Sequence, residues 1–252
     1  RLSATECCGA TRSPSGRRRG DGRLRVVRRI STPRDPSTIS CVTLVTQCSE
    51  DRLAQLSRTA AGWVPQGCLS AAILLRSTAL GAVLGRVRRL IEAATAAGCW
   101  MRVLLVADQR QSRRGEGVSD GALYPINAMR NLALSAAQTE LIMLIDVDQV
   151  PSNGLAARLA AGGAPLAEVL LSSRIAVVVP AFEPTTDTGD AAAVAHTAER
   201  QTSLTASQLR EWRDEGSVQT FGIATYPRGH EGTDESAWLK MALSANYIPP
   251  VR

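Results

Sequence analysis

The chain has 252 residues, 44% of them hydrophobic, so it can bury the core of one large domain or of two small ones. Its net charge of +6 is concentrated at one end: ten arginines and three acidic residues give residues 1–40 a charge of +7, which leaves −1 for residues 41–252. A near-neutral remainder with only 4% aromatic residues excludes a broad basic and aromatic surface for specific nucleic-acid binding. No window approaches the ~18 apolar residues that a membrane-spanning helix requires.

The arginine-rich start is also rich in Gly, Ser and Pro, which predicts a disordered tail over residues 1–38 and a folded domain over residues 39–252. The tail's cations could touch RNA, acidic lipid or nothing, and we favour no specific partner. The six cysteines show no paired CxxC spacing, which argues against a zinc site. Cys41 and Cys48 flank one predicted strand, and we interpret them as small buried residues with free thiols.

Strand-like runs alternate with helix-like runs along the rest of the chain, which predicts an α/β fold with a mainly parallel sheet. The predicted strands cover residues 41–46, 71–75, 102–107, 141–145 and 175–179. One helix is predicted to start at residues 49–51, others cover 80–97 and 125–138, and a short one follows Pro151. A polar stretch at 109–121 has the length of a lid or binding loop at the ligand end of the sheet.

The apolar run at residues 141–145 stops on two carboxylates, Asp146 and Asp148. Five apolar residues without helical periodicity predict a strand buried on both faces, at the centre of a parallel sheet. Ligands bind beyond the carboxyl ends of such strands, and residues two apart in an extended chain project to the same side. Two carboxylates placed in this way can share Mg²⁺ or Mn²⁺ with a nucleoside diphosphate. Alternatively, the aspartates merely end the strand and cap the next turn.

The predicted helix before this strand carries Asn127, Arg130 and Asn131 at spacings that share one helix face. If buried, such a polar trio needs hydrogen-bond partners. The planar guanidinium of Arg130 and the two flanking amides could pair with the aspartates, with the edge of a uracil or with a diphosphate. Alternatively, the trio simply faces water.

Five blocks in this order resemble the LARGE-like glycosyltransferases and their β-1,4-glucuronyltransferase relatives over about residues 41–250. The blocks are Val42–Cys48, Tyr124–Asn127 with Arg130–Ala133, the strand that ends at Asp146-Val147-Asp148 with Val150-Pro151-Ser152, Val178–Glu183, and Tyr226–His230 with Thr233, Asp234 and Trp238.

The resemblance implies a GT-A (Rossmann-like) nucleotide-sugar-binding fold, incomplete at the C-terminus because family members continue further. It implies a UDP-sugar donor, a glycan or glycoprotein acceptor, and Mn²⁺ (or Mg²⁺) at Asp146 and Asp148. It also implies the Golgi lumen, with type II membrane attachment through an anchor absent from this chain. No specific nucleic-acid partner is expected.

Members of this family transfer glucuronate from UDP-glucuronate with inversion, which requires a general base on the acceptor hydroxyl. The resemblance makes Asp148 the direct metal ligand and Asp146 a ribose or second metal contact, with Asn127, Arg130 and Asn131 holding the nucleotide or the aspartates. We expect Glu183 to be the catalytic base and Asp234 the alternative, although each could be only a loop carboxylate or a helix N-cap.

Arg228, beside His230, is the candidate for recognition of the donor carboxylate, because a guanidinium pairs well with a carboxylate. A catalytically inactive scaffold of the same fold is the alternative function. A phosphatase-like use of the Asp-x-Asp motif is disfavoured, because that nucleophile normally follows the first strand of a domain.

Overall fold

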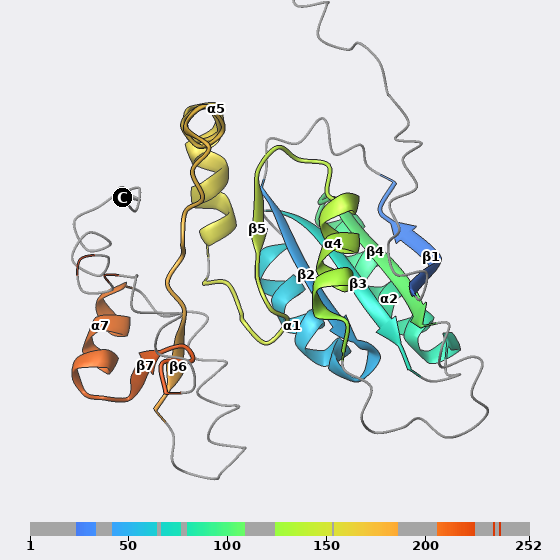
Figure 1. Ribbon diagram of the computed structural model, residues 1–252, viewed down its shortest axis with the longest axis horizontal. Helices are drawn as coiled ribbons and strands as arrows, with labels where there is room; N and C mark the ends of the chain where they lie inside the picture. The colour runs from blue at the N-terminus through green and yellow to red at the C-terminus, as the bar shows by residue number, and fades with distance from the viewer. Residues whose placement is uncertain are drawn as a thin grey trace, which may run out of the picture.

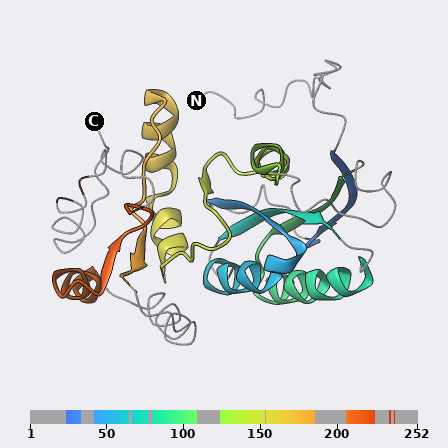
Figure 2. The ribbon, with the colours of Figure 1, turned by 60° about the horizontal axis from the view of Figure 1, so that its bottom comes forward.

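The computed structural model describes residues 24–33, 42–64, 67–76, 80–108, 124–152, 154–185, 206–224, 234 and 237. A five-stranded sheet in the order β1-β4-β3-β2-β5 forms its larger part, with helices on both faces (Figures 1 and 2). The strands are β1 (Leu24–Ser31), β2 (Thr43–Ser49), β3 (Cys68–Leu75), β4 (Met101–Asp108) and β5 (Ile142–Leu144). Strands β2 to β5 are parallel and only β1 is antiparallel, which confirms the predicted α/β class and mainly parallel sheet.

The helices agree in position with most of the sequence predictions. The 3-10 turn η2 (Glu50–Arg52) and α1 (Leu53–Trp63) follow β2, α2 (Leu80–Ala96) follows β3, and α4 (Ile126–Ala136) precedes β5. Helix α5 (Leu155–Ser173) is much longer than the short helix expected after Pro151. The predicted loop at 109–121 lies outside the described residues.

Two hydrophobic cores hold the helices to the sheet. Helices α1 and α2 cover one face, where Leu56, Trp63 and Val87 are fully buried against β2, β3 and β4. Helix α4 covers the other face with Met129 and Ala133, and Ser70 Oγ on β3 donates a hydrogen bond of 2.8 Å to Ala133 O. Every residue of β2 and β3 is buried because both faces are covered, so these two strands form the centre of the sheet.

Three sequence expectations were wrong. Residues 24–31 of the supposed disordered tail form β1, because Leu24, Val26 and Ile30 pack against the cores of the sheet while the arginines stay exposed, as suits a charged edge strand. The strand of the Asp-x-Asp motif lies at an edge of the described sheet rather than in its centre, and its Ile142 and Leu144 are exposed. Residues 175–179 form no strand, and Val178 and Val179 are exposed.

A smaller unit follows α5. Its strands β6 (Phe182–Pro184) and β7 (Val218–Thr220) pair antiparallel, and α7 (Ala206–Asp214) precedes β7. The unit lies beside α5 and away from the five-stranded sheet (Figures 1 and 2). Among the described helices, none is long and apolar enough by itself to cross a membrane; the two halves of α5, bent by 73°, meet that test only together.

Candidate functional site

The two aspartates of the motif follow β5 at the carboxyl edge of the parallel strands. Ile145 and Val147 are buried on either side of Asp146, so both aspartates point away from the core. This alternation agrees with the prediction that the two carboxylates project to the same side, and it places them at the edge where parallel sheets bind ligands.

Each aspartate is paired with an arginine from a different element. Arg130 on α4 places Nη2 2.5 Å from Asp146 Oδ1, and the two side chains are 28% and 39% exposed. Arg52, at the end of η2, places Nη1 3.4 Å from Asp148 Oδ2, and both side chains are 51% exposed. The Asp146 pair is therefore short and sheltered, whereas the Asp148 pair is long and open to solvent.

The backbone between the aspartates is fixed as a turn. The Asp146 N–H donates to Gln149 Oε1 at 3.1 Å, and the Gln149 N–H donates to Asp146 O at 3.0 Å. From α1, the buried Thr59 hydroxyl lies 3.3 Å from Val147 O and 3.2 Å from Gln149 O and donates to these carbonyls. Helix α1 thus anchors the turn that presents both carboxylates.

Tyr124, just before α4, adds a half-buried phenol to the same edge. Its hydroxyl donates to Gln47 Oε1 near the end of β2. Burial, and then the neighbouring Cys48, raise the pKa of Tyr124, so the phenol stays protonated. Three nearby guanidinium groups partly oppose this rise in the pKa of Tyr124. They belong to Arg76, Arg52 and Arg130.

The polar trio predicted on α4 is divided by the structure. Arg130 contacts an aspartate, as one of its proposed roles requires. Asn127 and Asn131 are exposed and make no hydrogen bond to another described residue, as the water-facing alternative expects. The amides therefore remain available to a ligand at this helix face.

The two candidate bases lie in the smaller unit. Glu183 on β6 accepts hydrogen bonds through Oε1 from Gln219 Nε2 at 3.0 Å and from the Gly222 N–H at 3.1 Å. These contacts tie β6 to the chain around β7. They correspond to the structural alternative for this carboxylate, and its catalytic role stays a prediction.

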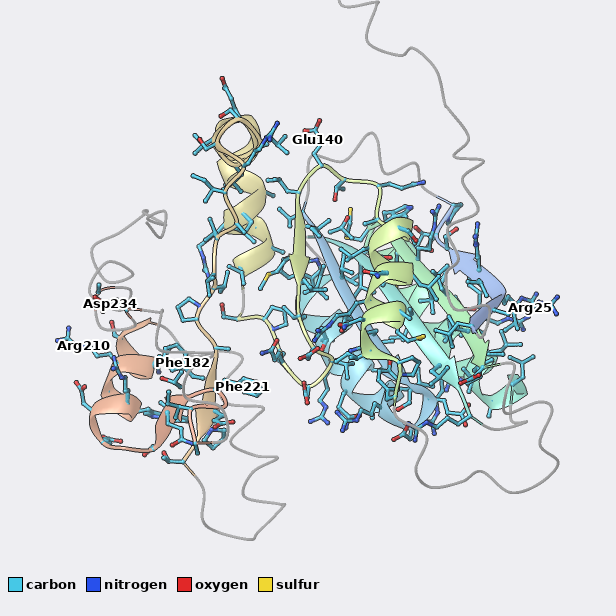
Figure 3. The ribbon with its side chains drawn as sticks, viewed as in Figure 1. Arg25, Glu140, Phe182, Arg210, Phe221 and Asp234 are labelled. Carbon is cyan, nitrogen blue, oxygen red and sulfur yellow. The ribbon has the colours of Figure 1, made fainter. Side chains whose placement is uncertain are left out.

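Asp234 lies in the same unit as Phe182 and Phe221 (Figure 3). Its Oδ1 accepts a hydrogen bond of 2.8 Å from the Ala237 N–H, three residues further on, which is the N-cap arrangement anticipated as its alternative role. Arg228 and His230 lie outside the described residues, so their predicted role in donor recognition stays a prediction.

Asp146 and Asp148 fit a hard divalent cation by the chemistry of their donors. Carboxylate oxygens suit Mg²⁺ or Mn²⁺, and such an ion commonly takes only one or two protein carboxylates and completes its shell with water and phosphate. Within the described part of the chain, no group of three or more His, Cys, Asp or Glu residues could hold a metal. A cation at this pair would take its remaining ligands from outside these two carboxylates, with water and phosphate oxygens as suitable donors.

Sequence reasoning missed three residues of this site: Arg52, Gln47 and Thr59. Gln47 and Arg52 could have been found from position alone, because they sit at and just after the end of a buried parallel strand. Nothing in the local sequence marks Thr59, whose role depends on how α1 packs against a turn far away in the sequence.

A family model described as "Glycosyl-transferase for dystroglycan" matches residues 96–249, more than half of the chain. Similar curated proteins are the xylosyl- and glucuronyltransferase LARGE2 of Rattus norvegicus, 31% identical over 83% of this chain and 28% of that protein, and LARGE2 of Homo sapiens, 31% identical over 83% and 26%. LARGE2 of Mus musculus is 35% identical over 52% of this chain and 18% of that protein. The chain thus spans about a quarter of the length of the first two relatives.

The matched region contains α4, the aspartate turn and the smaller unit, and the mainly parallel α/β sheet is consistent with a GT-A glycosyltransferase domain. The chain belongs to the LARGE-like family of glycosyltransferases.

Proposed function

We propose that this chain carries the donor-binding site of a glycosyltransferase that transfers glucuronate from UDP-glucuronate to a glycan acceptor by a metal-dependent inverting displacement. The observation that carries the proposal is the pair Asp146 and Asp148, both turned away from the core at the carboxyl edge of the parallel strands and flanked by arginines. The names of the relatives, which specify xylosyl and glucuronyl transfer, support a nucleotide-sugar donor.

Asp148 would be the direct ligand of Mn²⁺ or Mg²⁺, and Asp146 would contact the ion or the ribose. A bound cation of this kind neutralises the charge that develops on a departing diphosphate. Arg130 holds Asp146 in place, and the exposed amides of Asn127 and Asn131 would hydrogen-bond the nucleotide.

Asp148→Asn tests the metal site, because it keeps the size of the side chain and removes its charge. We expect loss of Mn²⁺-dependent hydrolysis and transfer of the donor. Glu140→Gln is a matched control: Glu140 is exposed at the opposite, amino end of β5 (Figure 3), so its loss of charge should leave the rate unchanged. Mn²⁺-dependent turnover retained by Asp148→Asn would contradict the proposal.

The general base would be Glu183 or, alternatively, Asp234. Glu183→Gln and Asp234→Asn separate the two, because the true base should lose about 10²–10⁴-fold in rate while donor binding persists. If both variants turn over near the wild-type rate, neither carboxylate is the base. A loss of stability without a specific loss of rate would match the structural hydrogen bonds that both residues make.

Recognition of glucuronate would rest on Arg228, beside His230, since an arginine fork pairs with the sugar's carboxylate. Arg228→Ala should reduce the preference for UDP-glucuronate over the neutral donor UDP-xylose. An unchanged preference would assign the carboxylate to another group.

A catalytically inactive, glycosyltransferase-like binding domain is the second candidate function. It is favoured by the structural hydrogen bonds of Glu183 and Asp234, the two residues considered as bases. Donor binding without measurable turnover, with the wild-type chain and a panel of acceptors, would support this alternative.

The Golgi lumen is the proposed location, with type II membrane attachment. Cys68 is disulfide-bonded, and disulfides persist in oxidising compartments of the secretory pathway. Co-localisation of the full gene product with a Golgi marker would support this assignment, and a cytosolic distribution would contradict it.

A further inference from the structure

The two arginine–aspartate pairs of the site are unequal. Asp146 is held at 2.5 Å by a guanidinium that is largely covered, whereas Asp148 is met at 3.4 Å by a guanidinium that is half exposed. Exposed ion pairs of the second kind contribute little stability and exchange easily with other charged partners. The ion pair of Arg52 with Asp148 is therefore the one that can open without disturbing the fold.

Arg52 is placed where it can change partners. It ends η2 immediately after β2, so its backbone is fixed by a central strand while its long side chain reaches into solvent. Arg76, which follows β3, also lies at this strand edge, and both guanidiniums lower the pKa of Asp51, after the larger effect of its hydrogen bond with Ser49. The carboxyl edge of β2 and β3 thus carries a second cation besides Arg52.

We propose that Arg52 is an exchangeable counter-ion: it neutralises Asp148 in the free protein and moves to the diphosphate of the donor when a divalent cation takes Asp148. This inference rests on the proposed donor site and adds a residue that neither the sequence motif nor the family comparison assigns.

The exchange follows from charge and reach. A guanidinium and a divalent cation repel each other if both stay on one carboxylate, so cation binding to Asp148 releases Arg52. The released guanidinium of Arg52 can donate two parallel hydrogen bonds to two phosphate oxygens. Such charge-assisted hydrogen bonds are stronger than its exposed ion pair with Asp148 at 3.4 Å. Arg130 does not exchange, because its contact is short and its Nε is buried.

The test measures two affinities of the 252-residue chain separately, and neither depends on turnover. Mn²⁺ alone is titrated by the electron paramagnetic resonance signal of the free ion, and UDP is titrated by calorimetry at saturating Mn²⁺. Arg52→Ala should tighten Mn²⁺ binding about two- to fivefold, because a competing cation is lost. The same variant should weaken UDP binding about tenfold, because a charge-assisted contact to phosphate is lost.

Two further variants serve as controls. Arg52→Lys keeps the charge but not the fork, so it should leave Mn²⁺ affinity near wild type and weaken UDP binding by less than the alanine variant. Arg58→Ala removes an exposed arginine of α1 that has no ion pair among the described residues, and it should change neither affinity.

Opposite shifts of the two affinities support the exchange, since a merely misfolded variant would lose both. A fall of both affinities in Arg52→Ala, or no change in either, would overturn it. If the wild-type chain binds Mn²⁺ but not UDP, or binds neither, the proposed donor site itself is wrong and the exchange is excluded with it.

Discussion

Arg130 Nη2 lies 2.5 Å from Asp146 Oδ1, which ties the first residue of the Asp-x-Asp motif to the helix that precedes its strand. The same guanidinium has a buried Nε without a hydrogen-bond partner. A cation held in this way costs desolvation that its carboxylate partner must offset. The pair therefore fixes the direction of Asp146 more firmly than an open surface contact would.

Double-mutant cycles should rank the two pairs of the site. For Arg130→Ala with Asp146→Ala, we expect a coupling free energy of unfolding of about 1–2 kcal/mol, because the pair is short and partly buried. For Arg52→Ala with Asp148→Ala, we expect less than about 0.5 kcal/mol, since both side chains are half exposed. Urea unfolding measures both, and equal couplings would contradict the division into a fixed and an exchangeable pair.

Most of the sheet could be predicted from the sequence because its strands leave strong local signals. Strands β3 and β4 are dominated by apolar residues, β2 carries β-branched and apolar residues, and the period of α2 predicts its bounds to within one residue. Pairing order is a long-range property, so an apolar run such as 141–145 cannot show whether it lies in the centre or at an edge. The apolar residues of β1 were overlooked because the surrounding arginines dominate the composition of that segment.

The site was predictable where neighbours in sequence decide it. Asp146 and Asp148 point out because Val147 between them packs inward, and the position of Arg130 follows from a helix ending shortly before the strand. The ion pair of Arg52 with Asp148 could not be predicted from the sequence, because the two residues come from distant segments that only the sheet order brings together. The hydrogen bonds of Glu183 likewise depend on β6 and β7 pairing across a long insertion.

Thr59→Val should loosen the turn that carries the aspartates. The buried hydroxyl is the contact of α1 with the carbonyls of Val147 and Gln149, and valine keeps its shape without the donor. We expect a loss of about 1 kcal/mol in unfolding free energy, with weaker Mn²⁺ binding. Ser57→Ala is the control, since its hydroxyl bonds only Leu53 O within α1. Mn²⁺ affinity unchanged in Thr59→Val would show that the turn holds its shape without this contact.

The thiol of Cys48 should make the protein less stable at high pH. Burial, and then the neighbouring Asp51, raise its pKa from 9.0 to about 12 against a smaller effect of Arg52, so folding favours the protonated thiol. Unfolded chains lose this proton first, so the stabilisation is complete below about pH 9 and disappears as the pH rises towards 12.

Unfolding free energy measured across this range should therefore fall less steeply in Cys48→Ala than in wild type. Some dependence should remain, because the pKa of Tyr124 is raised in the same direction. Identical slopes in the two proteins would mean that Cys48 titrates alike in both states. Native Cys48 should also resist alkylation at pH 8, since it is buried and carries a free but protonated thiol.

A matched pair of glycine substitutions should shift stability in opposite directions. Gly67 lies between α1 and β3, where an added Cβ would press on Trp63 Nε1 and lie 2.7 Å from Trp63 Cε2. The indole cannot withdraw, because it is fully buried and donates a hydrogen bond of 2.7 Å to Cys68 O. Gly67→Ala should therefore cost about 2–3 kcal/mol in unfolding free energy by overpacking.

Gly85, inside α2, presents the opposite case. A Cβ added at Gly85 would have Arg89 Nη1, the flexible end of a side chain, as its nearest neighbour at 4.0 Å, so alanine fits without a clash. Because glycine in a helix interior is less favourable than alanine, Gly85→Ala should raise the unfolding free energy by about 0.5–1 kcal/mol. Denaturant unfolding of both variants checks the pair. A Gly67→Ala protein of wild-type stability would mean that Trp63 has room to move and that this corner between α1 and β3 is not tightly packed.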